Sequence, residues 1–293
     1  MKAVIIPNLT RANCYSITKE VCMQLDKSGI EYYFDDSCAQ KLEFVNKSRF
    51  INIDSVLPQS DLVISVGGDG SILNASKKAV KYDVPVLGVN AGNLAYLMGI
   101  ENDELFLLDR LTDKDYTVEE RIMLDVKTYM GDNLIFSSEC LNDAVFARGM
   151  RLQLTELSLF CDGKHVNDYK TDGIIISTPT GSTAYNLSAG GPVAQPDVEL
   201  IMMTPICPHS LTARTILFNV NSTLTVIKPE DSKRELLLSC DGDEAFNLPS
   251  GSRTIVAGSE KKARFIKIKD DSFTDILNAK LNDQSKYNRK DIL

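Results

Sequence analysis

The sequence predicts two unlike domains, an α/β domain built on a parallel sheet and then a β-rich domain. Through about residue 110, short and almost wholly apolar segments alternate with segments whose apolar residues recur at helical spacing. That alternation is typical of a parallel sheet covered by helices on both faces. Beyond residue 110, short strand-like segments follow one another closely, with glycine, asparagine and aspartate between them. This second pattern favours an all-β arrangement.

The first domain is expected to span residues 1–110 and to carry four strands. A helix is expected between the first two strands because Ile17, Val21 and Leu25 recur at helical spacing. A second helix is expected at 72–80, directly after the third strand. The four strands are predicted at residues 3–6, 31–34, 62–66 and 84–89.

The second domain is expected to span residues 111–269. Its strands are predicted at 123–129, 134–137, 144–147, 152–160, 174–177, 224–227, 235–239 and 264–268. After residue 272 the pattern becomes helical again, with Phe273, Ile276 and Leu277 on one face. One terminal helix followed by a mobile tail is therefore expected.

Composition excludes several classes of protein. The formal net charge of −8 argues against binding to nucleic acid, although helix N-termini can still hold a nucleotide's phosphates on an acidic protein. No segment approaches the ~18 consecutive apolar residues of a membrane span. The seven cysteines are odd in number and widely spaced, which predicts free thiols. A soluble, cytoplasmic protein without a membrane partner is expected.

A glycine turn connects the third strand to the helix that follows it: Gly67-Gly68-Asp69-Gly70-Ser71. Such a turn points backbone N–H groups at an anion and lets a phosphate approach closely. Gly67, Gly68, Gly70 and Ser71 are therefore predicted to bind phosphate. The alternative is a plain turn in which Asp69 caps the helix. The turn lacks the lysine of the G-x-x-x-x-G-K-[ST] loop.

Two later segments carry groups suited to a nucleotide. Asn142 and Asp143 suit sugar hydroxyls or an adenine edge, because an amide both donates and accepts while a carboxylate accepts. Residues 174–177 form a buried strand that leads into a turn rich in hydroxyl groups, and Tyr185 can stack on a flat heterocycle. An ordinary Asn-Asp turn and a Ser/Thr capping turn are the alternatives.

Several of these segments resemble the NAD kinase family. The family's glycine motif, GGDG followed by Ser or Thr, matches 67–71, and its LN(D/E) motif matches 141–143. Its most extended signature matches 170–185, and two further segments match 187–192 and 204–211. Lipid kinases and 6-phosphofructokinases share related glycine loops, so the NAD assignment depends on the segments downstream.

The resemblance also implies an architecture and an assembly. It implies a Rossmann-like, phosphofructokinase-like parallel sheet in the first domain, with residues 270–293 returning to it, and a β-rich second domain that binds NAD. A homodimer or homotetramer is expected. Asp241 fits a further family segment, whereas Asp243 stands where glutamine is frequent. Asn93 and Ala95 stand where many members have histidine and glycine.

The implied reaction transfers the γ-phosphoryl group of ATP to the 2′-hydroxyl of the adenosine ribose of NAD and makes NADP. Mg²⁺ would bridge the ATP phosphates, and no direct protein ligand to it is predicted. Asp69 is the implied catalytic base, and we expect it to orient the hydroxyl and take its proton late, because phosphoryl transfer is loose. The residues implied to bind NAD are Asp69, Gly70, Asn142, Asp143, Lys170, Asp172, Thr183, Ala184, Tyr185, Asn186, Leu187, Ser188 and Asp243.

Two other functions stay open at this stage. One is a kinase of the same superfamily that acts on a lipid or a sugar. The other is a catalytically silent protein that senses NAD or NADP. The sequence also leaves open whether ATP, another triphosphate or polyphosphate is the donor, and whether NAD or NADH is the acceptor.

Overall fold

The structure, a computed structural model, describes residues 1–92, 95–150 and 153–279. The chain forms two compact units, here called the α/β unit (Met1–Glu120 with Ala263–Leu293) and the β-rich unit (Arg121–Lys262). The chain passes from one unit to the other inside the long strands β6 (Thr117–Met130) and β17 (Arg253–Lys267). The boundaries between the two units therefore lie within strands, whereas the sequence predicted domain boundaries near residues 110 and 269.

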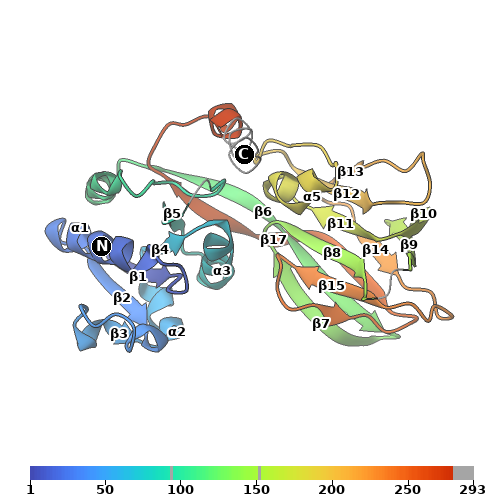
Figure 1. The fold of residues 1–293 in the computed structure, drawn as a ribbon, viewed down its shortest axis with the longest axis horizontal. Helices are drawn as coiled ribbons and strands as arrows, with labels where there is room; N and C mark the ends of the chain where they lie inside the picture. The colour runs from blue at the N-terminus through green and yellow to red at the C-terminus, as the bar shows by residue number, and fades with distance from the viewer. Residues whose placement is uncertain (93–94, 151–152, 280–293) are drawn as a thin grey trace, which may run out of the picture. The chain divides into compact units, whose positions relative to one another are not determined.

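The α/β unit is built on a parallel sheet, as predicted (Figure 1). Its strands are β1 (Lys2–Pro7), β2 (Glu31–Asp35), β3 (Phe50–Ile51), β4 (Leu62–Gly67) and β5 (Val86–Asn90). They lie in the order β3-β2-β1-β4-β5, and the end of β17 pairs in parallel with β5 at Phe265 and Val86. The order reverses between β1 and β4, the place in such sheets where ligands commonly bind.

Helices connect these strands. The longest are α1 (Cys14–Lys27), between β1 and β2, and α3 (Asp69–Ala79), between β4 and β5. The shorter ones are η1 (Asp36–Cys38), η2 (Lys47–Arg49), α2 (Ile53–Val56), η3 (Leu57–Gln59), η4 (Val80–Tyr82), η5 (Leu105–Asp109) and α4 (Arg110–Asp113).

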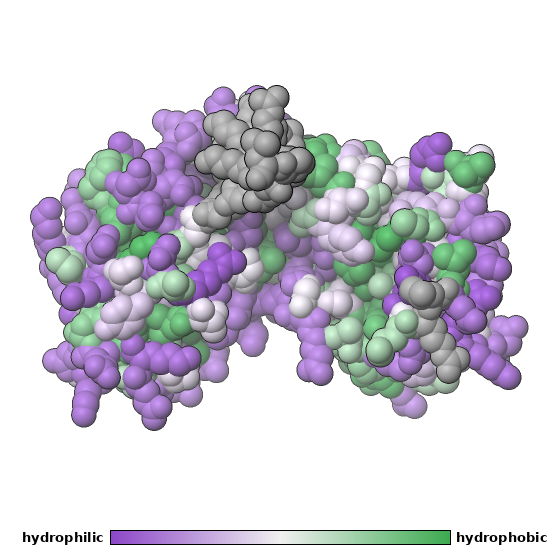
Figure 2. Space-filling model, in the orientation of Figure 1, coloured by the Kyte–Doolittle hydropathy of each residue, from purple (hydrophilic) through white to green (hydrophobic). Residues whose placement is uncertain are grey.

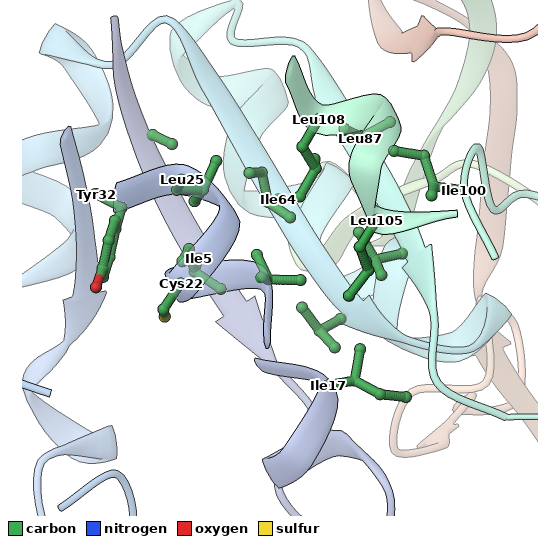
Figure 3. Close-up of a cluster of buried hydrophobic side chains, with 14 of the residues drawn as sticks. Ile5, Ile17, Cys22, Leu25, Tyr32, Ile64, Leu87, Ile100, Leu105 and Leu108 are labelled. Atoms are coloured by element: carbon green, nitrogen blue, oxygen red, sulfur yellow. The ribbon is translucent and has the colours of Figure 1, made fainter. Parts of the chain in front are cut away.

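The core of the α/β unit joins the sheet to α1 and η5 (Figure 3). From α1, Ile17 and Leu25 are buried as their helical spacing predicted. They share one cluster with Ile5 and Ile64 of the sheet and with Leu108 of η5. Each fully buried aliphatic side chain of this kind contributes roughly 1.5–3 kcal/mol. This packing fixes the position of the end of β4, where the glycine turn begins.

The β-rich unit contains one antiparallel sheet and the antiparallel part of the sheet that continues through β17 and β5 into the α/β unit, which confirms the predicted class of the second domain. One sheet has the order β13-β12-β11-β8-β15-β16. The other contains β10-β9-β14-β17, with β6 paired to β17 and to β7. Side chains of both sheets share one core. The remaining strands are β7 (Asn133–Cys140), β8 (Asp143–Arg148), β9 (Thr155–Cys161), β10 (Lys164–Thr171), β11 (Gly173–Ser177), β12 (Leu200–Ile206), β13 (Ile216–Asn219), β14 (Leu224–Ile227), β15 (Leu236–Cys240) and β16 (Phe246–Asn247).

Two short helices and the end of the chain complete the description. In the β-rich unit, η6 (Thr180–Thr183) and α5 (Tyr185–Ser188) follow β11. Residues 273–279 are helical, while the rest of the predicted terminal helix and tail, 280–293, lies outside the described residues. Figure 2 shows hydrophilic residues along the surface of both units, with patches of hydrophobic residues on the β-rich unit. Within the described part of the chain, no helix is long and apolar enough to span a membrane.

Candidate active site

The glycine turn joins the buried strand β4 to α3. The hydroxyl oxygen of Ser71 accepts the Gly68 N–H at 3.3 Å and the side-chain amide of Asn8 at 3.2 Å. With two bonds accepted, the Ser71 hydroxyl keeps its own proton for donation to a ligand. A Cβ on Gly67 would lie 2.2 Å from the Ser71 oxygen, so the turn closes only with glycine there, whereas Gly70 faces open space.

Asp69 is the first residue of α3, and its carboxylate is fixed by backbone from another loop. Its Oδ2 accepts the N–H of Tyr96 at 2.8 Å, and its Oδ1 accepts the N–H of Leu97 at 2.9 Å. Gly68, not Asp69, is the N-cap residue of α3. The alternative interpretation, in which Asp69 caps the helix, is therefore wrong. Each carboxylate oxygen keeps a second lone pair for a ligand.

A hollow of about 350 Å³ lies beside the turn. It is bordered by the carboxyl end of β1, by Ser71 and Asn74 of α3, and by Lys41. It thus lies near the point where the strand order reverses. The guanidinium of Arg11 lies against the backbone nearby, because a Cβ on Gly68 or Gly92 would come within 3 Å of it. The hollow can therefore accept an anionic group.

In the β-rich unit, the predicted pair Asn142-Asp143 lies where β7 turns into β8. The N–H groups of Leu141, Asn142 and Asp143 all donate to the carboxylate of Asp241, at 2.8, 2.7 and 3.1 Å. Asp241 follows β15, which pairs with β8. One side of this turn is therefore held by a single side chain.

The carbonyl groups of the same turn are held from β11 and the residue after it. Thr178 donates its hydroxyl to Leu141 O at 2.6 Å and its N–H to Asn142 O at 2.9 Å. Ser177 donates its hydroxyl to Asn142 O at 3.2 Å. The Oδ1 atom of Asn142 is buried and lacks a hydrogen-bond partner among the described residues. The backbone of the turn is thus engaged by the protein, while this amide oxygen receives no hydrogen bond from the described residues.

The predicted segment 183–188 covers η6 and α5. Tyr185 is 45% exposed, so its ring is available for stacking. Asn186 differs, because its amide is fully buried and donates to the carbonyl groups of Ser182 and Pro192 while accepting the Thr204 hydroxyl at 2.6 Å. Its side chain therefore holds the turn together. Of the other predicted residues here, Ser188 is exposed and Thr183, Ala184 and Leu187 are partly buried.

The remaining predicted residues fall into two places. Asp243 is exposed and follows β15, at the same end of the sheet as Asn142. Asp172 precedes β11, at the opposite end of that strand, and forms an ion pair with Arg148 at 2.5 Å. The five residues of β11 span about 17 Å at ~3.3 Å per residue. The Nζ atom of Lys170 forms an ion pair with Oε1 of Glu156 at 3.7 Å. The structure therefore separates Asp172 and Lys170 from the Asn142 group.

Sequence reasoning missed two of these residues as parts of the site. Arg148 ends β8 and has no motif around it, and only its charge after an apolar strand could have drawn attention. Asp241 was noted only as a match to a family segment, although its carboxylate organises the Asn142 turn. Across the described ranges there is no group of three or more His, Cys, Asp or Glu side chains that could hold a metal ion.

A glycine turn suited to phosphate at the carboxyl end of a parallel sheet is typical of enzymes that bind nucleotides. Residues 4–116 match the model of the ATP-NAD kinase N-terminal domain, and residues 141–268 match that of the ATP-NAD kinase C-terminal domain. The chain belongs to the NAD kinase family, as the motifs predicted.

Relatives and solved structures agree with this assignment. An NAD kinase of Thermoanaerobacter sp. (strain X514) is 33% identical over 287 residues, which cover 97% of this chain and 99% of the relative. An NAD kinase of Acetivibrio thermocellus is 35% identical over 285 residues, covering 97% and 98%. Yeast NADH kinase complexed with NADH shares the fold, with a TM-score of 0.84, 23% identity, and 95% of this chain and 85% of that chain covered. An NAD kinase from Archaeoglobus fulgidus in complex with ATP has a TM-score of 0.70 and 24% identity, covering 92% and 94%.

Proposed function

We propose that this protein transfers the γ-phosphoryl group of ATP to the 2′-hydroxyl of the adenosine ribose of NAD, giving NADP. The observation that carries the proposal is the carboxylate of Asp69, which two backbone N–H groups hold at the glycine turn. A carboxylate fixed in this way beside a turn suited to phosphate can direct a hydroxyl toward a phosphorus atom. The family of the chain supports the choice of NAD as acceptor.

In the reaction, the free lone pairs of Asp69 accept the hydrogen bond of the 2′-hydroxyl. The hydroxyl oxygen attacks the γ-phosphorus as the bond to the β-phosphate oxygen breaks, and the proton passes to Asp69 late. Orientation matters more than early deprotonation because the transition state is loose. The Ser71 hydroxyl and the N-terminus of α3 would face the developing charge on the phosphate oxygens.

The acceptor would be held by the polar turns of the β-rich unit. The free amide oxygen of Asn142 and the carboxylate of Asp143 would bind ribose or adenine groups, and Tyr185 would stack on a ring. Lys170 and Asp172 are assigned to the dinucleotide by resemblance, as is Asp243. Asn186 would act by holding the turn that carries Tyr185.

Mg²⁺ would enter on the phosphates of the donor. No direct protein ligand to the ion is proposed, and the residues around the turn that would face the phosphates with it are Ser71 and the N-terminus of α3. When bound, the ion neutralises charge on the phosphate oxygens.

The test is NADP formation by the wild-type protein and by Asp69→Asn. The wild type should form NADP from NAD with ATP and magnesium, and the same assay with NADH, GTP and polyphosphate defines acceptor and donor. Asp69→Asn should retain NAD binding and lose turnover by about a hundredfold or more. Asp83→Asn is the matched control, since Asp83 is an exposed aspartate of the same unit that pairs with Arg264. Binding of NAD without any product in the wild type would instead identify a sensor.

We also propose that the protein is cytoplasmic and assembles as a homodimer or homotetramer. The first proposal rests on the seven widely spaced cysteines, which predict free thiols in a reducing compartment, and the second on the resemblance to the family. Light scattering coupled to size-exclusion chromatography would give the oligomeric state, and a monomer at micromolar concentration would contradict the proposal.

A further inference from the structure

Asp241 occupies an unusual place in the β-rich unit. It follows β15 in the left-handed region, with φ of 51°, and is partly buried. Its Oδ1 accepts the N–H groups of Asn142 and Asp143, and its Oδ2 accepts that of Leu141. Hydrogen bonds to an ionised acceptor are shorter and roughly twice as strong as neutral ones. Three consecutive N–H groups thus converge on one carboxylate.

The same residue also holds the turn through its backbone. The Asp241 N–H donates to Asp143 O at 3.0 Å. Together with the bonds from Ser177 and Thr178, this accounts for every N–H and C=O group of residues 141–143. Leu141 and Asn142 lie between β7 and β8 and belong to neither strand, so the shape of the turn at these two residues depends on these bonds.

The direction of the Asn142 and Asp143 side chains follows from that shape. The turn is held on its carbonyl side by β11 and on its N–H side by Asp241. Without the carboxylate, three N–H groups in a largely buried turn would lack acceptors, and the turn would move to find others. A displacement of about 1 Å is enough to weaken a positioned contact severely.

We infer that Asp241 is a positioning residue for the dinucleotide: its carboxylate clamps residues 141–143 and so aims Asn142 and Asp143 at the acceptor substrate. The inference rests on the proposed function, which assigns those two side chains to NAD. Asp241 itself acts through the turn, so it affects binding of the acceptor and leaves the phosphoryl donor untouched.

Asp241→Asn tests the clamp without straining the backbone. Asparagine tolerates the left-handed region as aspartate does, and it has the same size. In asparagine an NH₂ group replaces one of the two acceptor oxygens. Its proton points at a backbone N–H of the turn, so at least one of the three hydrogen bonds is lost and the two donors repel each other. Asp241→Gly keeps the left-handed turn and removes the clamp entirely.

The measured quantities are the KM for NAD, the KM for ATP, kcat, and the Kd for NAD without ATP. Asp241→Asn should raise the KM and Kd for NAD about tenfold and leave kcat and the KM for ATP near wild type. Asp241→Gly should raise them further. The matched control is Asp162→Asn, because Asp162 also has a left-handed backbone (φ of 50°) and accepts a backbone N–H, from Thr223 at 2.8 Å. It should keep wild-type constants.

Three results would overturn the inference. A folded Asp241→Asn variant whose NAD affinity matches the control would do so. A loss of active protein with unchanged KM values would show a role in folding alone, as would the failure of both Asp241 variants to fold. Asn142→Ala separates this failure from that of the proposed function. If Asn142→Ala weakens NAD binding while Asp241→Asn does not, only the clamp is wrong; if neither does, the NAD assignment of the turn falls.

Discussion

Replacing Gly181 by alanine should damage the acceptor site through a collision that the structure locates. Gly181 is buried in η6, and a Cβ there would lie 2.2 Å from Asn142 O and 2.6 Å from Asn142 C. The two backbones must separate by roughly 1.3 Å or more to reach ordinary contact distance. Overpacking of this kind costs about 1–3 kcal/mol of stability.

The loss of stability should be accompanied by a loss of affinity for the acceptor. A shift of about 1 Å in Asn142 O breaks the bonds from Thr178 N–H and the Ser177 hydroxyl. A misplacement of that size costs up to about a hundredfold in productive binding. We therefore expect the KM for NAD to rise at least tenfold at 25 °C in a coupled assay of NADP formation, with the KM for ATP unchanged.

A control must separate this effect from general destabilisation. Gly131, in the turn between β6 and β7, has φ of 58° and open space around its Cβ position. Gly131→Ala should cost a similar ~1–2 kcal/mol through backbone strain alone. Urea unfolding measures both costs. If Gly181→Ala and Gly131→Ala, at comparable stability, show the same KM for NAD, the argument from the collision is refuted.

Two further predictions concern stability. Lys269 donates to Glu104 at 2.8 Å. Burial alone would raise the pKa of Glu104, but this hydrogen bond and the one from the Glu101 N–H hold the pKa below the ordinary value of a glutamate. Lys269→Met should thus cost about 1 kcal/mol at pH 7, and the difference from wild type should shrink as the pH falls below about 4.5, measured by urea unfolding at several pH values. Thr204→Val should cost about 1–3 kcal/mol, because it leaves the buried Oδ1 of Asn186 without its donor, and an unchanged unfolding midpoint would contradict this.

The α/β unit could be predicted well because its signals are local. The wholly apolar segments around Ile5, Ile64 and Leu87 became β1, β4 and β5, buried on both faces. The helical spacing of Ile17 and Leu25 became the buried face of α1. The strand β3, two residues long at Phe50 and Ile51, and short helices such as η5 carried too short a pattern to be recognised.

In the β-rich unit, local sequence patterns did not predict every strand. The strand β10 (Lys164–Thr171) was not predicted, because it is largely exposed and carries mostly polar side chains. The strand β12 (Leu200–Ile206) contains Pro205 and was treated as a motif. The ladder around it, from β11 on one side and β13 on the other, determines its structure, and the paired residues lie 13 to 33 positions away in the sequence, beyond the reach of a local pattern.

The site divides in the same way. Asn142, Asp143 and Tyr185 could be selected from their chemistry within short motifs. The clamp by Asp241 could not, because its three bonds join residues 98 to 100 positions apart. The pairing of Asp172 with Arg148, 24 positions apart, needed the β8–β11 ladder in the same way. Residue type thus indicated which side chains could bind a ligand, and only the fold showed which other residues hold those side chains in position.

The two aspartates use backbone N–H groups in opposite senses. Asp69 is held by the loop that supplies Tyr96 and Leu97, and its free lone pairs are left for the reacting hydroxyl. Asp241 instead holds another segment, because its carboxylate accepts the N–H groups of Leu141, Asn142 and Asp143. The same change, aspartate to asparagine, should therefore give opposite kinetic results. At position 69 it removes an interaction made in the transition state and lowers kcat, whereas at position 241 it weakens ground-state binding and raises KM for NAD.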